Sequence, residues 1–419
     1  MLSTLDITAP QSGQRPVLIA GGGVSGMQAA LSLAALGIPV LLVEKNAHLG
    51  GQVMRLDKVY PTDHCAFCPA WSTAKACYDS PLIKVVLHAE LTGLSTDGEQ
   101  PLAEVTVRRP AIDPATCLFC GACADACPKK AILRRDPIMT WDPALPPAMR
   151  IDATLCDECG ACAKACPVSA IDLKVQPVSV SVPVADVIYA TGFAEPQPGE
   201  PEHAPEFGSG SHPDICTAME FEAWHGESRG QDRLVTRSDG RPVRRVAFVQ
   251  CAGARDVRHL PYCAAVCCMH AMKQARWLKR RQPDLDITLF YNDLRAPGAG
   301  QEAYIRAGEA EGIRLVRSRP GLVKDAGKLG VGVRYEDAAT GSALGEVFDM
   351  VVVNGGLAQC PLPGKAPAAA SAGPLAPVTL ACGFCAEPVD VAGAVIQGVA
   401  TAASAAIRRR SAESVGGDA

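Results

Sequence analysis

Two runs of four closely spaced cysteines are the residues of this sequence best suited to chemistry. Each run has the spacing C-x2-C-x2-C-x3-C-P, and the runs start 39 residues apart. Bacterial ferredoxins hold two [4Fe–4S] clusters with this spacing, and the fourth cysteine of each run ligates the other cluster. The spacing predicts one cluster on Cys117, Cys120, Cys123 and Cys166, and a second on Cys156, Cys159, Cys162 and Cys127.

Structural zinc is the alternative for these cysteines, because closely spaced thiolates also form tetrahedral sites. Zinc ribbons usually use two separated C-x2-C pairs, whereas each run here holds four cysteines and ends in proline. Gly121 and Gly160 stand where the chain must bend tightly around a cube. Short apolar segments at 131–133 and 170–173 follow the runs and are typical of ferredoxin strands. We therefore predict two cubane clusters in a repeated module.

The composition places the chain among soluble globular proteins. Its 419 residues allow two or three domains, and a net charge of −4 gives no bias toward nucleic acid. Nineteen cysteines in a long chain without a signal-like N-terminus predict metal ligation in a reducing cytoplasm. No apolar run is expected to be long enough to span a bilayer, which takes roughly 18 residues. Membrane association is therefore expected only through a partner.

A glycine-rich turn near the N-terminus predicts a dinucleotide site. An apolar strand at 17–20, the turn GGGVSG, a helical pattern and a strand at 39–43 ending in Glu44 follow one another. Gly21, Gly23 and Gly26 occupy the fingerprint positions that allow a tight turn and close approach of backbone to pyrophosphate. The helix N-terminus would face the phosphates, and Glu44 would accept the ribose hydroxyls. The later pair Gly50–Gly51 indicates FAD rather than NAD.

The cluster module is predicted to interrupt the FAD-binding domain. Strand-like segments at 83–87 and 104–107 precede the module, and a buried strand at 182–189 follows it. That strand ends in Ala190, Thr191 and Gly192, which is typical of a second FAD contact in flavoproteins with two dinucleotide domains. The module is therefore expected inside the domain and not as a separate tail.

A second dinucleotide domain is expected to open with a strand at 246–249, but its phosphate-binding turn lacks the glycines. Residues 250–256 contain one glycine, so nicotinamide is not expected to bind there. A basic amphipathic helix at 271–281 and strands at 287–291 and 351–354 follow. Residues 194–230 are interpreted as a surface loop or linker because they are rich in Pro, Gly, Ser and Glu. In this class of flavoprotein, the closing helix at 392–407 points its N-terminus toward the flavin pyrimidine.

With these segments in view, the sequence resembles the A subunits of heterodisulfide reductase and of the quinone-interacting membrane-bound oxidoreductase complex. The segments that carry the resemblance are LDKVYPTDHCAFC, ATGF, SDGRPVRRVAFVQCAGARDVRHLPYCAAVCCMHAMKQA, LFYNDLRA and CGFCAEPVDVAGAVIQG. The resemblance implies an α/β, thioredoxin-reductase-like flavoprotein of two dinucleotide-type domains with an inserted two-cluster, ferredoxin-like α+β module. Long heterodisulfide-reductase A subunits carry an extra N-terminal domain and a second ferredoxin module, and typical quinone-complex A subunits lack the insertion. The chain is expected to stand between these two groups.

The resemblance also implies a third [4Fe–4S] cluster, held by cysteines of the flavoprotein core. The candidate ligands are Cys65, Cys68, Cys263, Cys267 and Cys268. A redox dithiol at Cys65 and Cys68 is one alternative, and inert structural thiols are another. Further cysteines are interpreted as packing residues because free cysteine is commonly buried: Cys216, Cys251, Cys360 and Cys382. No general acid or base is assigned, and three histidines near cysteines are interpreted as structural: His64, His259 and His270.

Five domain segments and one candidate FAD site follow from these patterns. The segments are an FAD-binding part (14–108), the cluster module (109–176), a continued FAD-binding part with a loop (177–245), a second Rossmann-like domain without the fingerprint (246–345) and a C-terminal FAD-binding part (346–419). The candidate FAD-contacting residues are Gly21, Gly23, Val24, Ser25, Gly26, Glu44, Lys45, Gly50, Gly51, Gln52, Ala190, Thr191, Gly192, Gly383, Asp390 and Val391.

The expected function is electron transfer by an oxidoreductase subunit, in which the redox chemistry belongs to FAD and the clusters. The resemblance implies partner subunits of a heterodisulfide-reductase-like or quinone-oxidoreductase complex in the cytoplasm. A homodimer is a further expectation, and nucleic acid is not expected as a partner. The alternatives are an NAD(P)H-dependent flavin reductase of a small substrate, a dithiol/disulfide oxidoreductase using Cys65 and Cys68, and a scaffold whose FAD is structural.

Overall fold

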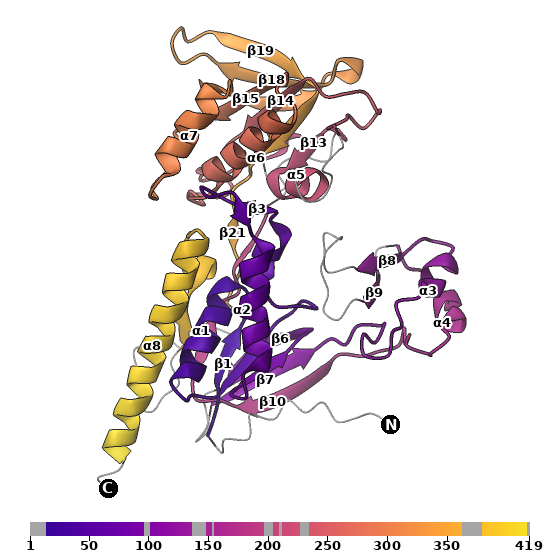
Figure 1. Cartoon of the computed structure of the whole chain (residues 1–419), viewed down its shortest axis with the longest axis vertical. Helices are drawn as coiled ribbons and strands as arrows, with labels where there is room; N and C mark the ends of the chain where they lie inside the picture. The colour runs from indigo at the N-terminus through magenta and orange to yellow at the C-terminus, as the bar shows by residue number, and fades with distance from the viewer. Residues whose placement is uncertain are drawn as a thin grey trace.

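The computed structural model divides the chain into two α/β domains and an inserted module (Figure 1). It describes residues 14–95, 101–135, 148–152, 155–196, 204–208, 212–226, 234–362 and 379–416. Each domain is built around a five-stranded parallel sheet, with helices on one face and a three-stranded antiparallel sheet on the other. This arrangement confirms the predicted class, a flavoprotein of two dinucleotide-type domains with an insertion.

The first domain has a parallel sheet whose strands are short, apolar and almost fully buried, as a sheet covered on both faces requires. Its strand order is β22 (Thr379–Ala381), β11 (Val187–Tyr189), β1 (Val17–Ala20), β2 (Val40–Val43) and β5 (Ile83–Val86). One face packs on the helices α1 (Val24–Ala35), α2 (Phe67–Asp79) and α8 (Val391–Gly416). The other face packs on the antiparallel strands β6 (Ala89–Ser95), β7 (Leu102–Val107) and β10 (Val178–Pro183).

The cluster module leaves and re-enters the first domain at one place. Strands β7 and β10 are antiparallel neighbours, and Val107 pairs with Val178 at the end where the module begins. The module contains α3 (Ala122–Asp125), β8 (Ile132–Arg135), β9 (Ala148–Ile151) and α4 (Ala161–Ala165), and it stands to one side of the sheets (Figure 1). The expected strand at 170–173 is reduced to one isolated bridge between Ile112 and Ile171.

The second domain repeats the plan of the first. Its parallel sheet has the order β13 (Ile215–Thr217), β20 (Met350–Val353), β14 (Arg245–Val249), β15 (Asp286–Tyr291) and β16 (Arg314–Arg317). The helices α5 (Ala218–His225), α6 (Cys267–Arg281) and α7 (Gln301–Ala310) cover one face. The antiparallel strands β17 (Leu322–Asp325), β18 (Val331–Glu336) and β19 (Ala343–Phe348) cover the other.

Two expectations about the second domain were wrong. Strands β13 and β20 belong to its sheet, so the domain begins before residue 246 and continues beyond residue 345. The sequence could not assign β20 because a run of apolar residues suits either parallel sheet equally well. The supposed linker at 194–230 also contains β13 and α5. A capping box between Thr217 and Glu220 starts α5, and this S/T-x-x-E pattern is the one local signal of the helix.

The remaining elements are short. They are η1 (Gly51–Arg55), the hairpin of β3 (Lys58–Val59) and β4 (His64–Cys65), the pair β12 (Phe193–Ala194) and β21 (Ala358–Gln359), η2 (Pro205–Phe207), η4 (Gly327–Leu329) and η5 (Gly383–Cys385). Among the described residues, α8 is long and apolar enough by length and composition to cross a membrane, over Val391–Arg410. The expectation that no run reaches that length was therefore wrong.

The hairpin β3–β4 is fastened to the second domain by a buried charge network. Glu222 of α5 is fully buried and accepts hydrogen bonds from the backbone N–H of Asp57 (2.9 Å) and from Nζ of Lys273 (2.5 Å). Lys273 also donates to the carbonyl oxygen of Lys58 (2.9 Å). Its ammonium, together with His270, holds the pKa of Glu222 far below its usual range, although burial alone would raise it. The hairpin therefore has a fixed position relative to α6.

Candidate functional site

A large cavity in the described part of the chain lies at the carboxyl end of the first parallel sheet. Its volume is about 950 Å³, and Ala20 and Val43 line it where β1 and β2 end. Ligands of open α/β folds bind at this end of the strands. The predicted FAD-contacting residues that line it are Gly21, Gly23, Val24, Ser25, Glu44, Lys45, Gly50, Gly51, Gln52, Ala190, Thr191, Gly192, Asp390 and Val391.

The glycines of this cavity are required by close backbone contacts. A Cβ on Gly26 would lie 1.9 Å from the carbonyl oxygen of Gly21, so only glycine lets α1 pack against the end of β1. A Cβ on Gly51 would lie 2.9 Å from Cα of Gly23. Gly26 and Gly383 do not line the cavity themselves. Gly383 instead has a φ of +72° and donates its N–H to Oε1 of Gln397, which fixes η5 to α8.

The carboxylate of Glu44 is held in one orientation at the edge of the cavity. Its Oε2 accepts from the N–H of Gly22 (2.7 Å), and its Oε1 accepts from the N–H (2.8 Å) and Nδ2 (2.7 Å) of Asn46. Only 4% of Glu44 is exposed. The Oγ1 of Thr191, which also lines the cavity, is buried and has no hydrogen-bond partner in the structure. A cradle of glycines, a fixed acid and an unsatisfied hydroxyl fit a dinucleotide with polar ribose and phosphate groups.

Sequence reasoning missed part of the lining of the cavity. Phe193, Met219 and Phe384 contribute apolar surface from β12, α5 and η5, and Cys360 lies with them. Arg150 reaches the cavity from β9 of the cluster module, so the module takes part in forming the flavin site. These contacts depend on how several separate segments pack together, and no local sequence pattern predicts them.

The second run of cysteines forms the predicted mixed ligand set. A small cavity is lined by Cys156, Cys159 and Cys162 together with Cys127 of the first run. Burial raises the pKa of the Cys162 thiol, and the nearby thiols of Cys156 and Cys127 raise it further. Burial likewise raises the pKa of Cys123, with contributions from two thiols of its own run, those of Cys117 and Cys120. The position of Cys127 beside the second run therefore agrees with the predicted exchange for that cluster.

Backbone N–H groups point at the sulfurs of both runs. Phe119 donates to Sγ of Cys117 and Glu158 to Sγ of Cys156, both at 3.4 Å. Each donor lies two residues after its cysteine and has a positive φ, +54° and +56°. Such bonds stabilise the negative charge that thiolate sulfurs carry in a cluster. The donor set and its hydrogen bonds fit [4Fe–4S] clusters.

A third group of thiols lies where β14 ends. Cys251, Cys263, Cys267 and Cys268 come from the strand end, the following loop and the first turn of α6, and they act on one another electrostatically. Burial raises the pKa of Cys267 well above its usual value, and the other three thiols add to the rise. Cys251 was expected to be a packing residue, but its thiol is only partly buried and lies close enough to Cys263 for the two to influence each other electrostatically.

The loop at this third group repeats the local geometry of the cluster runs. The N–H of Ala265 donates to Sγ of Cys263 at 3.3 Å, and Ala265 has a φ of +62°. The donor again lies two residues after the cysteine. Cationic Arg255 and Arg319 lie close enough to lower the pKa of Cys251, against the larger effect of burial. In a nucleotide-binding domain, this position after the first strand would hold the phosphate-binding turn.

Cys65 and Cys68 form a pair of their own. Both are exposed, and the hydrogen bond with Cys65 is the largest cause of the raised pKa of Cys68. Cys65 ends the clamped hairpin, and Cys68 lies in the first turn of α2. Cys216 and Cys382, in contrast, are fully buried within hydrophobic clusters, as packing residues should be.

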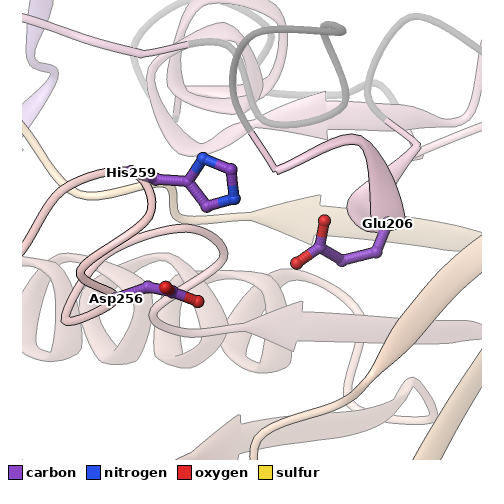
Figure 2. Close-up of side chains that lie close together, drawn as sticks. All are labelled: Glu206, Asp256 and His259. Carbon is purple, nitrogen blue, oxygen red and sulfur yellow. The ribbon is translucent and has the colours of Figure 1, made fainter.

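Three side chains in the second domain lie close enough to hold a cation, as Figure 2 shows: Glu206, Asp256 and His259. The carboxylate of Asp256 is already paired with Arg258 (2.7 Å) and Arg319 (3.0 Å). Those guanidinium groups lower its pKa and neutralise the charge that a cation would need. The group is better described as an ion-pair network that fixes the turn at 256–260.

Comparisons with known proteins define the class first. A family model described as FAD dependent oxidoreductase matches residues 16–64, and one described as 4Fe-4S binding domain matches residues 110–133 and 149–172. Thioredoxin reductase from Lactococcus lactis has the same fold, with a TM-score of 0.50, 14% identity and coverage of 94% of this chain and 99% of that one. The protein is therefore an iron–sulfur flavoprotein, whose cofactors are FAD and [4Fe–4S] clusters.

Relatives with similar sequences define the family within this class. One iron–sulfur A subunit of the CoB–CoM heterodisulfide reductase of Methanopyrus kandleri is 38% identical over 81% of this chain and 53% of its own length. The A subunit of the H2:CoB–CoM heterodisulfide, ferredoxin reductase of Methanothermobacter marburgensis is 33% identical with the same coverage. The chain is a homologue of heterodisulfide-reductase A subunits, which confirms the resemblance predicted from the sequence. It spans about half the length of these relatives.

Proposed function

We propose that the chain is the electron-transferring flavoprotein subunit of a heterodisulfide-reductase-like or quinone-oxidoreductase complex in the cytoplasm. When bound, FAD supplies two-electron chemistry and the clusters supply one-electron chemistry. The single observation that carries the proposal is the lining of the flavin cavity. It joins residues of both domains to Arg150 of the cluster module, so one chain surrounds the flavin and holds clusters beside it.

The residues of the chain have three tasks in this proposal. The glycines around Gly21 and Gly51 admit the pyrophosphate, and Glu44 is oriented for the ribose hydroxyls. The N-terminus of α8, with Asp390 and Val391, faces the cavity and favours negative charge on the reduced ring. The buried clamp on Glu222 fastens the chain at Asp57 and Lys58, which follows the flavin-binding turn, to the second domain.

We further propose that Cys251, Cys263, Cys267 and Cys268 hold a third cluster, and that Cys65 and Cys68 lie outside it. The mutual effects of the four thiols and the N–H bond to Cys263 support this ligand set. It revises the set expected from the sequence by adding Cys251. A cluster at the end of β14 would also occupy the place where a nicotinamide dinucleotide binds in related folds.

Anaerobic iron and flavin analysis of the purified chain tests the proposal. About twelve irons per FAD are expected, because each of three cubanes holds four. Cys251→Ser should lower the content by about four irons, whereas the matched control Cys216→Ser, a buried core thiol, should leave it unchanged. A loss in Cys68→Ser and none in Cys251→Ser would restore the original ligand set.

A titration with NADH and then dithionite separates the proposed function from its main alternative. Dithionite should bleach the flavin, while NADH should leave its absorbance unchanged over many minutes. Rapid bleaching by NADH would instead show an NAD(P)H-dependent reductase. A flavin that dithionite also fails to reduce would indicate a structural role.

A further inference from the structure

A glutamate that does not line the flavin cavity lies directly behind residues that do. Glu195 follows the short strand β12 and is partly buried. Its Oε1 accepts a hydrogen bond from the backbone N–H of Met219 (3.2 Å), and its Oε2 accepts one from Oγ1 of Thr217 (2.9 Å). Met219 lines the cavity, and so does Phe193, two residues before Glu195. The carboxylate is therefore held against the wall of the flavin site.

The same carboxylate lies within electrostatic reach of the third group of thiols. Burial and the neighbouring thiols raise the pKa of Cys267, and Glu195 adds to the rise. Tyr60 has a similar position, because burial raises its pKa, and Asp390 of the flavin cavity and Cys267 raise it further. Glu195 and Tyr60 therefore lie near both the flavin cavity and the thiols. Charge that arrives in the cavity acts on Glu195 at short range.

The hydrogen bonds around Glu195 suit both protonation states of its carboxyl group. As a carboxylate, it accepts from the hydroxyl of Thr217 and from the N–H of Met219. As a carboxylic acid, it can donate its own proton to Oγ1 of Thr217, because a hydroxyl both donates and accepts and rotates to suit. That Oγ1 accepts from the N–H of Glu220 (3.3 Å), which leaves it a second lone pair. Thr217 therefore fixes the carboxyl group in either state.

The groups that face Glu195 have opposing effects on its proton affinity. The titratable or charged ones come from four elements: Arg55 of η1, Cys216 of β13, Glu220 of α5 and Cys267 of α6. Burial raises the pKa of Glu195 to about 7, although its two hydrogen bonds and the positive charge of Arg55 lower it. The negative charge of Glu220 raises it further. A modest change in nearby charge is therefore enough to change the protonation of Glu195 near neutral pH.

We propose that Glu195 takes up a proton when the flavin is reduced, so that the carboxyl group offsets the negative charge that reduction places on the ring. This inference rests on the proposed function, since it requires a flavin in the cavity that can be reduced. The balance is two electrons and one proton for the ring, and one further proton from solvent for an oxygen of Glu195. The electrons come from a reduced iron–sulfur partner in the cell and from an electrode in the test.

The direction of the effect follows from the sign of the charge. Negative charge on the ring stabilises the protonated form of Glu195, so its pKa is higher in the reduced protein than in the oxidised one. The additional proton is therefore taken up above about pH 7, where Glu195 is ionised before reduction. Below that pH the carboxyl group is already protonated, and reduction adds nothing to it.

Infrared difference spectroscopy of the FAD-loaded full chain at about pH 7.5 tests the proposal. Reduction should produce the C=O stretching band of a protonated carboxylic acid, and carbon-13 labelling of glutamate should shift this band. The band should be absent in Glu195→Gln and present in the matched control Glu309→Gln, an exposed glutamate on α7. Thr217→Ser keeps the hydroxyl and should keep the band, whereas Thr217→Val should shift its frequency. Unchanged flavin absorbance shows that the variants fold.

The pH dependence of the flavin reduction potential gives a second measurement. Above pH 7 the wild type should take up about two protons per flavin, and Glu195→Gln about one. A wild-type flavin that is reduced without the band would overturn this proposal and leave the proposed function intact, even if Glu195→Gln fails to fold. Equal proton numbers in the wild type and Glu195→Gln would overturn it in the same way. A flavin that cannot be reduced would overturn both.

Discussion

Single residues decide whether the flavin cavity forms. Gly26 is the clearest case, because a Cβ there would overlap the carbonyl oxygen of Gly21 and push α1 away from β1. Gly26→Ala should destabilise the chain by about 1–3 kcal/mol and sharply lower the flavin content. Gly345→Ala provides a control, since its Cβ would meet no atom within 4 Å. Flavin absorbance per chain measures the flavin content, and urea unfolding measures the stability. Full flavin content in Gly26→Ala would contradict the claim that the cavity requires glycine at this position.

Another residue-scale prediction concerns pH. Burial lowers the pKa of His225 to about 4, and Arg281 adds to the effect. The unfolded chain therefore binds a proton below about pH 6.5 that the folded chain does not bind until about pH 4. The free energy of unfolding should therefore fall as the pH drops through this window, with the slope that corresponds to the uptake of about one proton. Urea midpoints from pH 7.5 to 5 measure the slope, and His225→Phe should flatten it.

The cysteines show what residue-level reasoning could and could not foresee. The eight ferredoxin cysteines could be predicted because their spacing within each run is a strong local signal. The position of Cys251 near Cys263 and Cys267 could not be foreseen, because these residues become close only when the loop after β14 folds back. Arg150 was missed for a similar reason, since it enters the flavin cavity from an inserted module. Residues whose role depends on the pattern within one segment could be predicted from the sequence. Residues whose role depends on contacts between distant segments could not.

At the scale of elements, the clamp between the β3–β4 hairpin and α6 makes a prediction about stability. Lys273→Met would leave Glu222 buried without its cation, which should cost about 3–5 kcal/mol of unfolding free energy. Arg306→Met on α7 is the matched control, because it removes an exposed ion pair with Glu302 that should contribute well under about 1 kcal/mol. Equal urea midpoints for the two variants would contradict the importance of the clamp.

The elements themselves were predicted unevenly. The first strand, turn and helix followed the sequence closely because their glycine and apolar patterns are local. Helix α5 lay hidden in a segment whose composition favours loops, and only the Thr217–Glu220 capping box marked it. Strand β20 was placed in the wrong sheet, because an apolar run shows that a strand is buried but not beside which neighbours.

For the whole molecule, the insertion point predicts that the cluster module can be removed. Replacing residues 110–175 by a short glycine-containing turn should leave β7 and β10 paired as a hairpin. The shortened chain should keep most of its FAD and lose about eight irons, the content of two cubanes. Loss of flavin together with the iron would show that Arg150 and its module are needed to hold FAD. Matched iron, flavin and unfolding measurements on the full chain complete the comparison.

The pairing of Val107 with Val178 also bears on how such proteins arise. The module joins its host through two adjacent strand ends, and the energetic cost to the host of a longer connection grows only slowly with length. A cluster module could therefore be inserted into a flavoprotein, or lost from it, in one genetic step. The hydrophobic core of the host would not have to change. Lineages that descend from such a host would then differ in their iron–sulfur clusters while sharing the same flavoprotein fold.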